Sequence, residues 1–282
     1  MIPLGRMLRR TTFVTLTALG LSLSPGMALG AAEEQPLTLD ATVQAKLLDL
    51  LKEYKPATPL AMISEVSEIN NKGNFGKSIY LARKAYYALQ DSGLLGIVTS
   101  AALTDGASAG SAQSLSLCGL LTVVGTAAGT SRNDSTGVIP FGKLFVPFGV
   151  RSSTDINRSE KLKQFDTTAA HICAPQPGEQ FTYRTETEFH FKISGMFGTT
   201  KTGTRTEEVS CKVDAGVQPA SGLLAVLRGD ALAVTCERIA QGGDKTTSEY
   251  VFLRDSGQYL LRAETIPVQT IKVRLEQAAY PQ

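Results

Sequence analysis

The stretch FTYRTETEFHFKI, which runs from Phe181 to Ile193, alternates strictly between two kinds of side chain. Phe, Tyr, Thr and Ile occupy the odd positions, whereas Arg, Glu, His, Lys and a single Thr occupy the even ones. Successive side chains of a β-strand point to opposite faces, so this period of two predicts a long strand with one buried and one solvated face. It is the clearest periodic signal in the chain, and it assigns the C-terminal part to the β class.

The same period recurs toward the C-terminus. Residues 205–213 alternate after a glycine-containing turn at 195–198, and Leu223–Leu227 predicts a short helical or turn connection. Further β-rich runs follow at 232–236, 249–254, 258–262 and 271–275. Short strands with short connections predict an antiparallel sheet, and we expect residues 178–282 to curl into a barrel or a sandwich.

Residues 31–93 have the spacing of short amphipathic helices. Asp40 is a suitable N-cap, and the first helix should end before Pro56. Apolar residues then recur about every three positions, and Gly93 is suited to follow the last helix. We therefore expect three short helices, over about 40–55, 58–71 and 75–90, and a fold of the α+β class.

Residues 94–177 form a middle segment rich in Gly, Ala, Ser and Thr, with a polar linker over 151–168. Its two apolar runs, 94–103 and 115–124, fit buried strands and buried helices equally well, because a short apolar run has no diagnostic period. Neither run reaches the roughly 18 continuous apolar residues of a membrane span. The secondary structure of this segment stays open at the level of sequence.

The four cysteines predict two disulfides and no zinc or redox site, because none of them has C-x-x-C spacing. Three connectivities are formally open. Cys211 and Cys236 each lie in phase with apolar residues of a predicted strand, so we expect them to bond across neighbouring strands. Cys118 would then bond to Cys173. A bridge between Cys211 and Cys236 should stabilise the fold by about 3 kcal/mol.

The first thirty residues have the features of an export signal. Three arginines before residue 11 are followed by an apolar core over 12–22 and by small residues at Ala28 and Gly30. This pattern predicts a signal peptide, residues 1–30, that is cleaved before Ala31. We therefore expect the chain in the periplasm or outside the cell, where disulfides persist.

The charge balance does not indicate a nucleic-acid partner. The whole chain carries 28 Lys and Arg against 26 Asp and Glu, and three of the basic residues lie in the predicted signal. The densest basic stretch, Arg158–Lys163, is interrupted by Glu160 and predicts a solvated face or loop. The fingerprints of nucleotide and dinucleotide binding do not occur in the sequence, so we expect no cofactor.

One motif has an enzymatic meaning. Gly106–Gly110 reads GASAG and matches the G-x-S-x-G pattern of a nucleophile elbow, in which Ser108 would be the nucleophile. The other members of a triad would come from two acids and two histidines, namely Asp155, Asp166, His171 and His190. The flanking pattern does not alternate strands with helices as that fold requires, so a secreted serine hydrolase is the alternative and not the main expectation.

Other polar residues predict structure instead of chemistry. His190 falls on the solvated face of the long strand with only Glu188 beside it, which is too few ligands for zinc. Four carboxylates on two neighbouring strands suit cross-strand ion pairs better than the paired acids of a glycosidase: Glu186, Glu188, Glu207 and Glu208. We expect no metal site.

Phe141, Phe145 and Phe148 lie in a segment interrupted by Gly and Pro. They could contact a membrane peripherally, or pack over an open end of the barrel, which is the more frequent outcome for aromatic residues. The sequence shows no convergent set of polar groups. We therefore expect a non-catalytic binding or structural role in the periplasm or cell envelope, with an envelope protein or a small ligand as partner.

Overall fold

The computed structural model describes residues 37–52, 54, 56–71, 78–141, 144–169, 171–194, 198–240 and 242–281, and over 132–152 it describes the backbone alone. The predicted signal peptide and its cleavage site before Ala31 lie outside these ranges. From Pro36 onward the chain forms one compact unit. The expected helical region, middle segment and C-terminal β domain are therefore parts of a single body.

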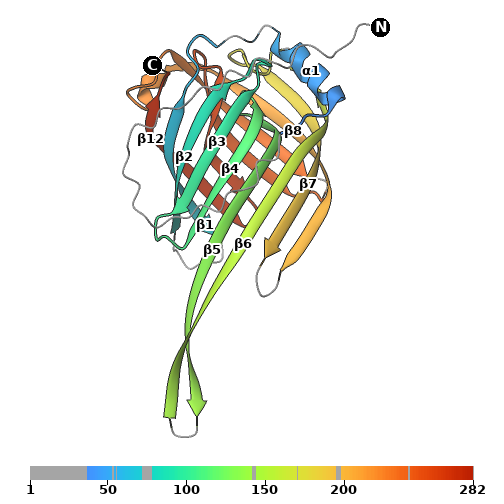
Figure 1. The fold of residues 1–282 in the computed structure, drawn as a ribbon. Coiled ribbons are helices and arrows are strands. Elements are labelled where there is room, and N and C mark those ends of the chain that lie inside the picture. The colour runs from blue at the N-terminus through green and yellow to red at the C-terminus, as the bar shows by residue number, and fades with distance from the viewer. Residues whose placement is uncertain are drawn as a thin grey trace, which may run out of the picture. The chain divides into compact units, whose positions relative to one another are not determined.

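This unit is a closed antiparallel β-barrel with one short α-helix near its N-terminal end, as Figure 1 shows. A 3-10 helix, η1 (Ala220–Gly222), lies in one of the connections between strands. Each strand pairs with its neighbours in chain order, and the last strand pairs with the first. The strands are β1 (Met62–Asn71), β2 (Ser78–Leu89), β3 (Leu95–Leu103), β4 (Ser108–Leu117), β5 (Leu121–Phe141), β6 (Leu144–Thr167), β7 (Gln180–Ser194), β8 (Thr199–Pro219), β9 (Asp230–Ala240), β10 (Lys245–Leu253), β11 (Gln258–Ile266) and β12 (Gln269–Ala279). Of the two architectures expected, the barrel is confirmed.

The helix α1 (Ala41–Leu51) forms where the first helix was predicted. The side chain of Asp40 accepts a hydrogen bond from the backbone N–H of Thr42 at 3.1 Å, as an N-cap does. This hydrogen bond lowers the pKa of Asp40 below its ordinary value. No helix in the described part of the chain is long and apolar enough to cross a bilayer.

The prediction of two further helices, over 58–71 and 75–90, is wrong, because these segments contain β1 and β2. The inner face of β1 carries the buried Glu65 and Ser67, so its apolar residues do not recur at every second position. Glu65 binds Arg83 of β2 at 2.8 Å. Charged side chains on the inside of the barrel thus hide the period of two that identifies a strand.

The Gly- and Ala-rich middle segment forms β3, β4, β5 and β6, which resolves its ambiguity in favour of strands. Small residues let β4 and β5 approach closely, since a Cβ atom at Gly110 would lie 2.8 Å from the carbonyl oxygen of Ala128. The prediction of a polar linker over 151–168 is wrong. Most of it belongs to β6, whose polar residues face solvent or the barrel interior.

Beyond the barrel, β5 and β6 continue as a two-stranded ribbon (Figure 1). The pairing of β4 with β5 ends at Ser131, and the pairing of β6 with β7 ends at Asp155. In contrast, β5 and β6 pair with each other as far as Phe141 and Leu144. Phe141, Phe145 and Phe148 belong to this ribbon, for which the structure describes the backbone alone. Their contact with a membrane or with the end of the barrel therefore stays a prediction.

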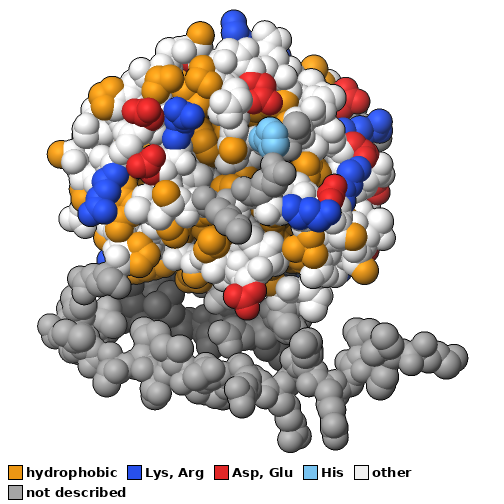
Figure 2. Space-filling view, turned by 90° about the horizontal axis from the view of Figure 1, so that it is seen from above, with side chains coloured by type: hydrophobic (Ala, Val, Ile, Leu, Met, Phe, Trp, Pro, Cys, Tyr) orange, Lys and Arg blue, Asp and Glu red, His pale blue; other side chains and the backbone are white. Residues whose placement is uncertain are grey.

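The end of the barrel opposite the ribbon is filled by an apolar core. The buried residues of α1 pack there against the β4–β5 turn, the connection after β6 and the first residues of β7. Figure 2 views this end and shows hydrophobic side chains scattered among neutral polar and charged ones. The core includes Val43, Leu47, Leu51, Leu117, Phe165, Ile172 and Phe181.

Two disulfides lie in this core, with the pairing that the sequence predicts. Cys118 bonds to Cys173 with a Cα separation of 5.6 Å, and Cys211 bonds to Cys236 with one of 4.1 Å. Cys118 and Gly119 have φ values of +45° and +81°, which the tight turn between β4 and β5 requires. The first disulfide therefore fastens this turn to the connection between β6 and β7.

Candidate functional site

The disulfide between Cys211 and Cys236 shows which faces of β8 and β9 point into the barrel. Both cysteines are buried in the apolar core, and side chains return to the same face at every second residue. Arg205 and Glu207 lie on β8 in phase with Cys211, and Arg238 lies on β9 in phase with Cys236. These three charged side chains therefore face the interior, called here the lumen.

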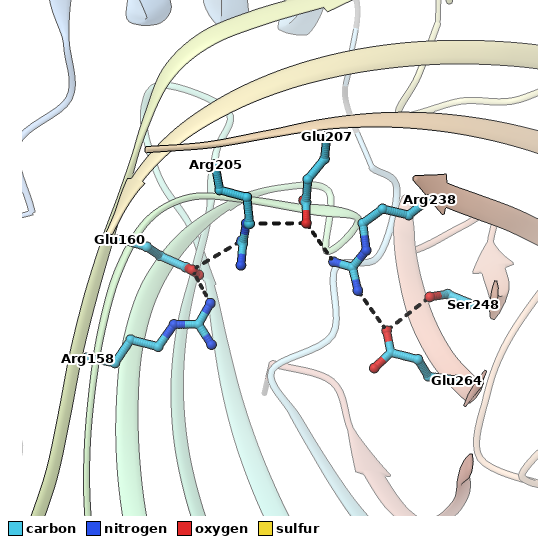
Figure 3. Close-up of polar contacts among 7 residues, drawn as sticks. All are labelled: Arg158, Glu160, Arg205, Glu207, Arg238, Ser248 and Glu264. Atoms are coloured by element: carbon cyan, nitrogen blue, oxygen red, sulfur yellow. Dashed lines mark hydrogen bonds and ion pairs between the residues drawn. The ribbon is translucent and has the colours of Figure 1, made fainter. Parts of the chain in front are cut away.

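Further polar residues from three other strands join them. Ser248 of β10 lies opposite Cys236 and Glu264, so Glu264 of β11 also faces inward. Figure 3 shows these residues with two more from β6, joined in one continuous chain of polar contacts. The lumen cluster, as we call it, consists of Arg158, Glu160, Arg205, Glu207, Arg238, Ser248 and Glu264.

Two of the five ion pairs of the lumen cluster are longer than hydrogen bonds. The nitrogen–oxygen separations are 2.6 Å for Arg158–Glu160, 3.2 Å for Arg205–Glu207, 3.4 Å for Arg238–Glu264, 3.7 Å for Arg238–Glu207 and 3.8 Å for Arg205–Glu160. Ser248 Oγ donates to a Glu264 oxygen at 3.1 Å. The Nε atom of Arg205 is buried and makes the 3.2 Å contact with Glu207 without the alignment of a hydrogen bond. The charges orient one another while several guanidinium N–H groups remain able to bind something else.

The lumen cluster lines a cavity of about 360 Å³. The guanidinium side chains of Arg205 and Arg238 are 35% and 34% exposed, whereas that of Glu207 is 12% exposed. Water therefore reaches the cavity, although its carboxylates are largely covered. Hydroxyl groups complete the wall, and they belong to Thr122, Tyr183, Thr185, Thr187, Ser248 and Tyr250.

Two tyrosines separate this cavity from the apolar core. The ring of Tyr183 lies 6.0 Å from that of Phe165, and the ring of Tyr250 lies 6.1 Å from that of Tyr259. Burial raises the pKa of both Tyr183 and Tyr250 above the ordinary value of a phenol. Both phenols are therefore neutral near pH 7 and can donate a hydrogen bond.

No family model, curated protein or solved structure matches this chain. The function of the cavity is therefore inferred from the chemistry of the residues that line it. The lumen cluster presents three guanidinium groups and three carboxylates, which are strong donors and strong acceptors around one space. Such an arrangement can orient a polar ligand by several hydrogen bonds at once.

The described residues supply neither a free thiol nor a metal site to this cavity. All four cysteines form disulfides. Within the ranges given above, no group of three or more His, Cys, Asp or Glu side chains could hold a metal ion.

Ser108 lies elsewhere, and the structure does not bring the possible triad together. Ser108 begins the antiparallel strand β4 after a turn that contains Gly106, and its Oγ lies 2.9 Å from Ser131 Oγ. His190 is exposed on the outer face of β7, three strands away, or roughly 14 Å at about 4.8 Å per strand. His171 lies near α1 at the other end of the barrel.

The two acids of that possible triad are also placed apart from Ser108. Asp155 of β6 accepts a hydrogen bond from Thr130 at 3.0 Å. Asp166 pairs with Lys46 of α1. Both acids therefore have local partners, and Ser108 lies at a strand start in place of a strand-to-helix elbow.

The lumen cluster corrects one expectation from the sequence and gives the location of another. The stretch Arg158–Lys163 was expected to be a solvated face, but Arg158 and Glu160 point into the barrel. Glu207 was expected to form a cross-strand ion pair, and it does so inside the barrel, where it lies 3.7 Å from Arg238. On the outer face, Glu188 lies 3.7 Å from Lys163 of the neighbouring strand.

Sequence reasoning missed the lumen cluster although a signal for it exists. Arg205 and Glu207 alternate in phase with Cys211, and Arg238 alternates in phase with Cys236. A buried disulfide identifies the inner face of its strands, so charged residues in the same phase must also lie inside. This conclusion was missed because charged residues were expected to lie on the outer surface.

Proposed function

We propose that this chain is an exported, non-catalytic binding protein whose barrel lumen holds a small polar ligand. The observation that carries the proposal is the lumen cluster around its cavity of about 360 Å³. Six charged side chains inside a barrel cost desolvation free energy, and apolar residues of similar size would often be as stable or more stable. Ligand sites typically combine a cavity of about 300–1,000 Å³ with a few convergent polar groups.

Export to an oxidising compartment is part of the same proposal. Two disulfides are typical of proteins in such compartments, and residues 1–30 have the composition of a signal peptide. Mass spectrometry of the protein from a periplasmic fraction should give an N-terminus at Ala31 and four oxidised cysteines. Four free thiols or an intact leader on the natural protein would contradict this part.

A lumen-blocking variant tests the binding proposal. Thr187 is 6% exposed and lines the cavity, so Thr187→Phe should fill part of it. Thr204 is exposed on the outer face of β8, so Thr204→Phe is a matched control. We expect native mass spectrometry to find a small molecule on the purified wild type and on Thr204→Phe but not on Thr187→Phe. Both variants should first show a cooperative urea transition.

A second candidate function is contact with a membrane or an envelope protein through the β5–β6 ribbon. The supporting observation is that the two strands pair only with each other beyond Ser131 and Asp155, within a sequence that is nearly uncharged over 137–150. Replacing residues 137–149 by a short Asn-Gly turn should then release the protein from a membrane pellet. If the intact chain already leaves that pellet in a high-salt wash, membrane insertion is excluded.

A further inference from the structure

We infer that the ligand of the lumen is a neutral polyhydroxylated molecule, a mono- or disaccharide, and not an ion. The inference rests on the proposed function and specifies its ligand. It is carried by three features of the lumen cluster: its charge balance, its unsaturated donors and acceptors, and the aromatic rings beside it.

The lumen cluster is electrically balanced. Arg205 lies between Glu160 and Glu207, with separations of 3.8 Å and 3.2 Å. Arg238 lies in the same way between Glu207 and Glu264, at 3.7 Å and 3.4 Å. An anion that binds either guanidinium would lie close to carboxylates that repel it. A cation that binds a carboxylate would likewise lie close to guanidinium groups that repel it. A neutral ligand avoids both penalties.

The hydrogen-bonding groups of the cavity suit hydroxyl groups in particular. A hydroxyl donates one hydrogen bond and accepts others, so it can bridge a carboxylate and a guanidinium that stand too far apart to bond directly. Two of the ion pairs are separated by 3.7 and 3.8 Å, which is a spacing at which a third polar group often mediates the contact. The Nε–H group of Arg205 is buried and lies 3.2 Å from Glu207 Oε1 without the alignment of a hydrogen bond, so it is one donor that such a ligand would satisfy.

Aromatic rings flank these polar groups. Tyr183 and Tyr250 line the cavity on the side of the apolar core. On the other side, Phe189 follows Thr187 on the inner face of β7, and its ring lies over Gly203, where an added Cβ would be 3.2 Å from Phe189 Cζ. Such rings can bury the apolar C–H face of a sugar ring while its hydroxyls meet the charged groups.

The cavity volume limits the size of the ligand. About 360 Å³ lies at the lower end of the range of small-molecule sites, which is about 300–1,000 Å³. This volume is suited to one or two sugar rings. The charged and hydroxyl-bearing wall is unsuited to a long acyl chain.

A set of matched probes tests the chemical class. We would measure calorimetric binding of four neutral disaccharides, maltose, trehalose, cellobiose and diacetylchitobiose, and screen further neutral saccharides on a glycan array. Glucuronate, inorganic phosphate and the zwitterion dialanine provide the charged comparison. We expect a neutral saccharide to bind with an affinity that changes less than twofold between 50 and 500 mM NaCl, because no net charge is screened.

A substitution that unbalances the cluster sharpens the test. Glu207→Gln keeps the shape but leaves the guanidinium groups of Arg205 and Arg238 in excess. It should weaken saccharide binding about tenfold, because a hydrogen bond to a charged group is lost, and it should create measurable glucuronate binding. Glu249→Gln, on the exposed outer face of β10, should change neither.

The possible failures differ. If glucuronate, phosphate or dialanine binds the wild type and no neutral saccharide does, the inferred class is overturned while lumen binding stands. If Thr187→Phe binds every probe as the wild type does, binding occurs outside the lumen and the proposed function falls as well. If no probe binds and no molecule copurifies with the wild type, both are overturned.

Discussion

The interior of this barrel has two zones that share the same strands but differ in chemistry. On β8, Val209 and Cys211 belong to the buried apolar core, while Arg205 and Glu207 on the same face line the cavity. On β9, Cys236 belongs to the core and Arg238 to the cavity wall. The change occurs within two residues, which is about 7 Å of strand.

The difference between the zones separates stability from binding. The apolar zone buries α1, several phenylalanines and both disulfides, and each of these contributes to the free energy of folding. The lumen cluster contributes little net stability, because its ion pairs are long and partly exposed to water. Variants in the two zones should therefore fail in different assays.

The largest effect should come from the apolar zone. Leu47 of α1 is 1% exposed, whereas its neighbour Leu48 is 39% exposed. Leu47→Ala should reduce the free energy of unfolding by about 3 kcal/mol through lost burial and a cavity, measured by urea denaturation. Leu48→Ala should change it by less than about 0.5 kcal/mol. Equal effects would show that α1 does not seal this end of the barrel.

The buried tyrosines, two of which lie at the border between the zones, should make the fold sensitive to alkali. Burial raises the pKa of Tyr54, Tyr87, Tyr183, Tyr250 and Tyr259 above the ordinary value, to about 12 for Tyr87. A raised phenol pKa means that stability is complete below about pH 10 and is lost as the pH rises toward the folded-state value. Each such tyrosine should remove about 1.4 kcal/mol per pH unit in that window.

Removing one phenol tests this directly. The free energy of unfolding should fall less steeply between pH 10 and 11 in Tyr183→Phe than in the wild type, by about 1.4 kcal/mol per pH unit, because one titrating group is removed. Urea denaturation at several pH values measures this slope. Tyr80 is 45% exposed on the outer face of β2, so Tyr80→Phe is the control and should keep the wild-type slope. An unchanged slope in Tyr183→Phe would mean that this phenol is not desolvated in the fold.

The same two zones explain how far the sequence could predict the fold. Where the inner face carries no charged residue, as on β7 from Phe181 onward, the period of two is clear and the strand prediction is confirmed. The disulfides followed from that phase as well. On β1 and β2 the inner face contains Glu65 and Arg83. The remaining apolar residues of these strands have a spacing that predicts helices, and that prediction is wrong. A barrel with a polar interior removes the contrast on which periodicity depends.

The site was harder to predict than the fold for a related reason. Glu160 and Glu264 lie on β6 and β11, which are five strands apart in the barrel order, and sequence alone does not show that their side chains join one chain of contacts. Closure of the ring brings them around one cavity. Only the local part of the site could be predicted from the sequence. Arg205, Glu207 and Arg238 alternate in phase with the disulfide-bonded cysteines, which places their side chains inside the barrel.

A smaller effect on stability should come from the lumen cluster itself. Arg238 is 34% exposed and pairs with Glu207 and Glu264 at 3.7 and 3.4 Å. Arg238→Met should lower the free energy of unfolding by only about 1 kcal/mol, since such exposed pairs are screened. It should nevertheless abolish ligand binding to the lumen. Arg274→Met, on the outer face of β12 and 76% exposed, should alter neither quantity.

The smallest effect should come from the outer attachment of α1. Asp166 of β6 pairs with Lys46 of α1, and both side chains are nearly half exposed. The hydrogen bond from Lys46, with another from Gln164, lowers the pKa of Asp166. A lowered carboxyl pKa means that the contribution is present above about pH 4 and is lost as the pH falls through the folded-state value. Asp166→Asn should thus lower the urea midpoint slightly at pH 7 and leave it unchanged at pH 2.5, where the wild-type carboxyl is protonated as well. A difference that persisted at pH 2.5 would show that Asp166 acts through packing and not through its charge, and that α1 is held by more than its apolar face and this ion pair.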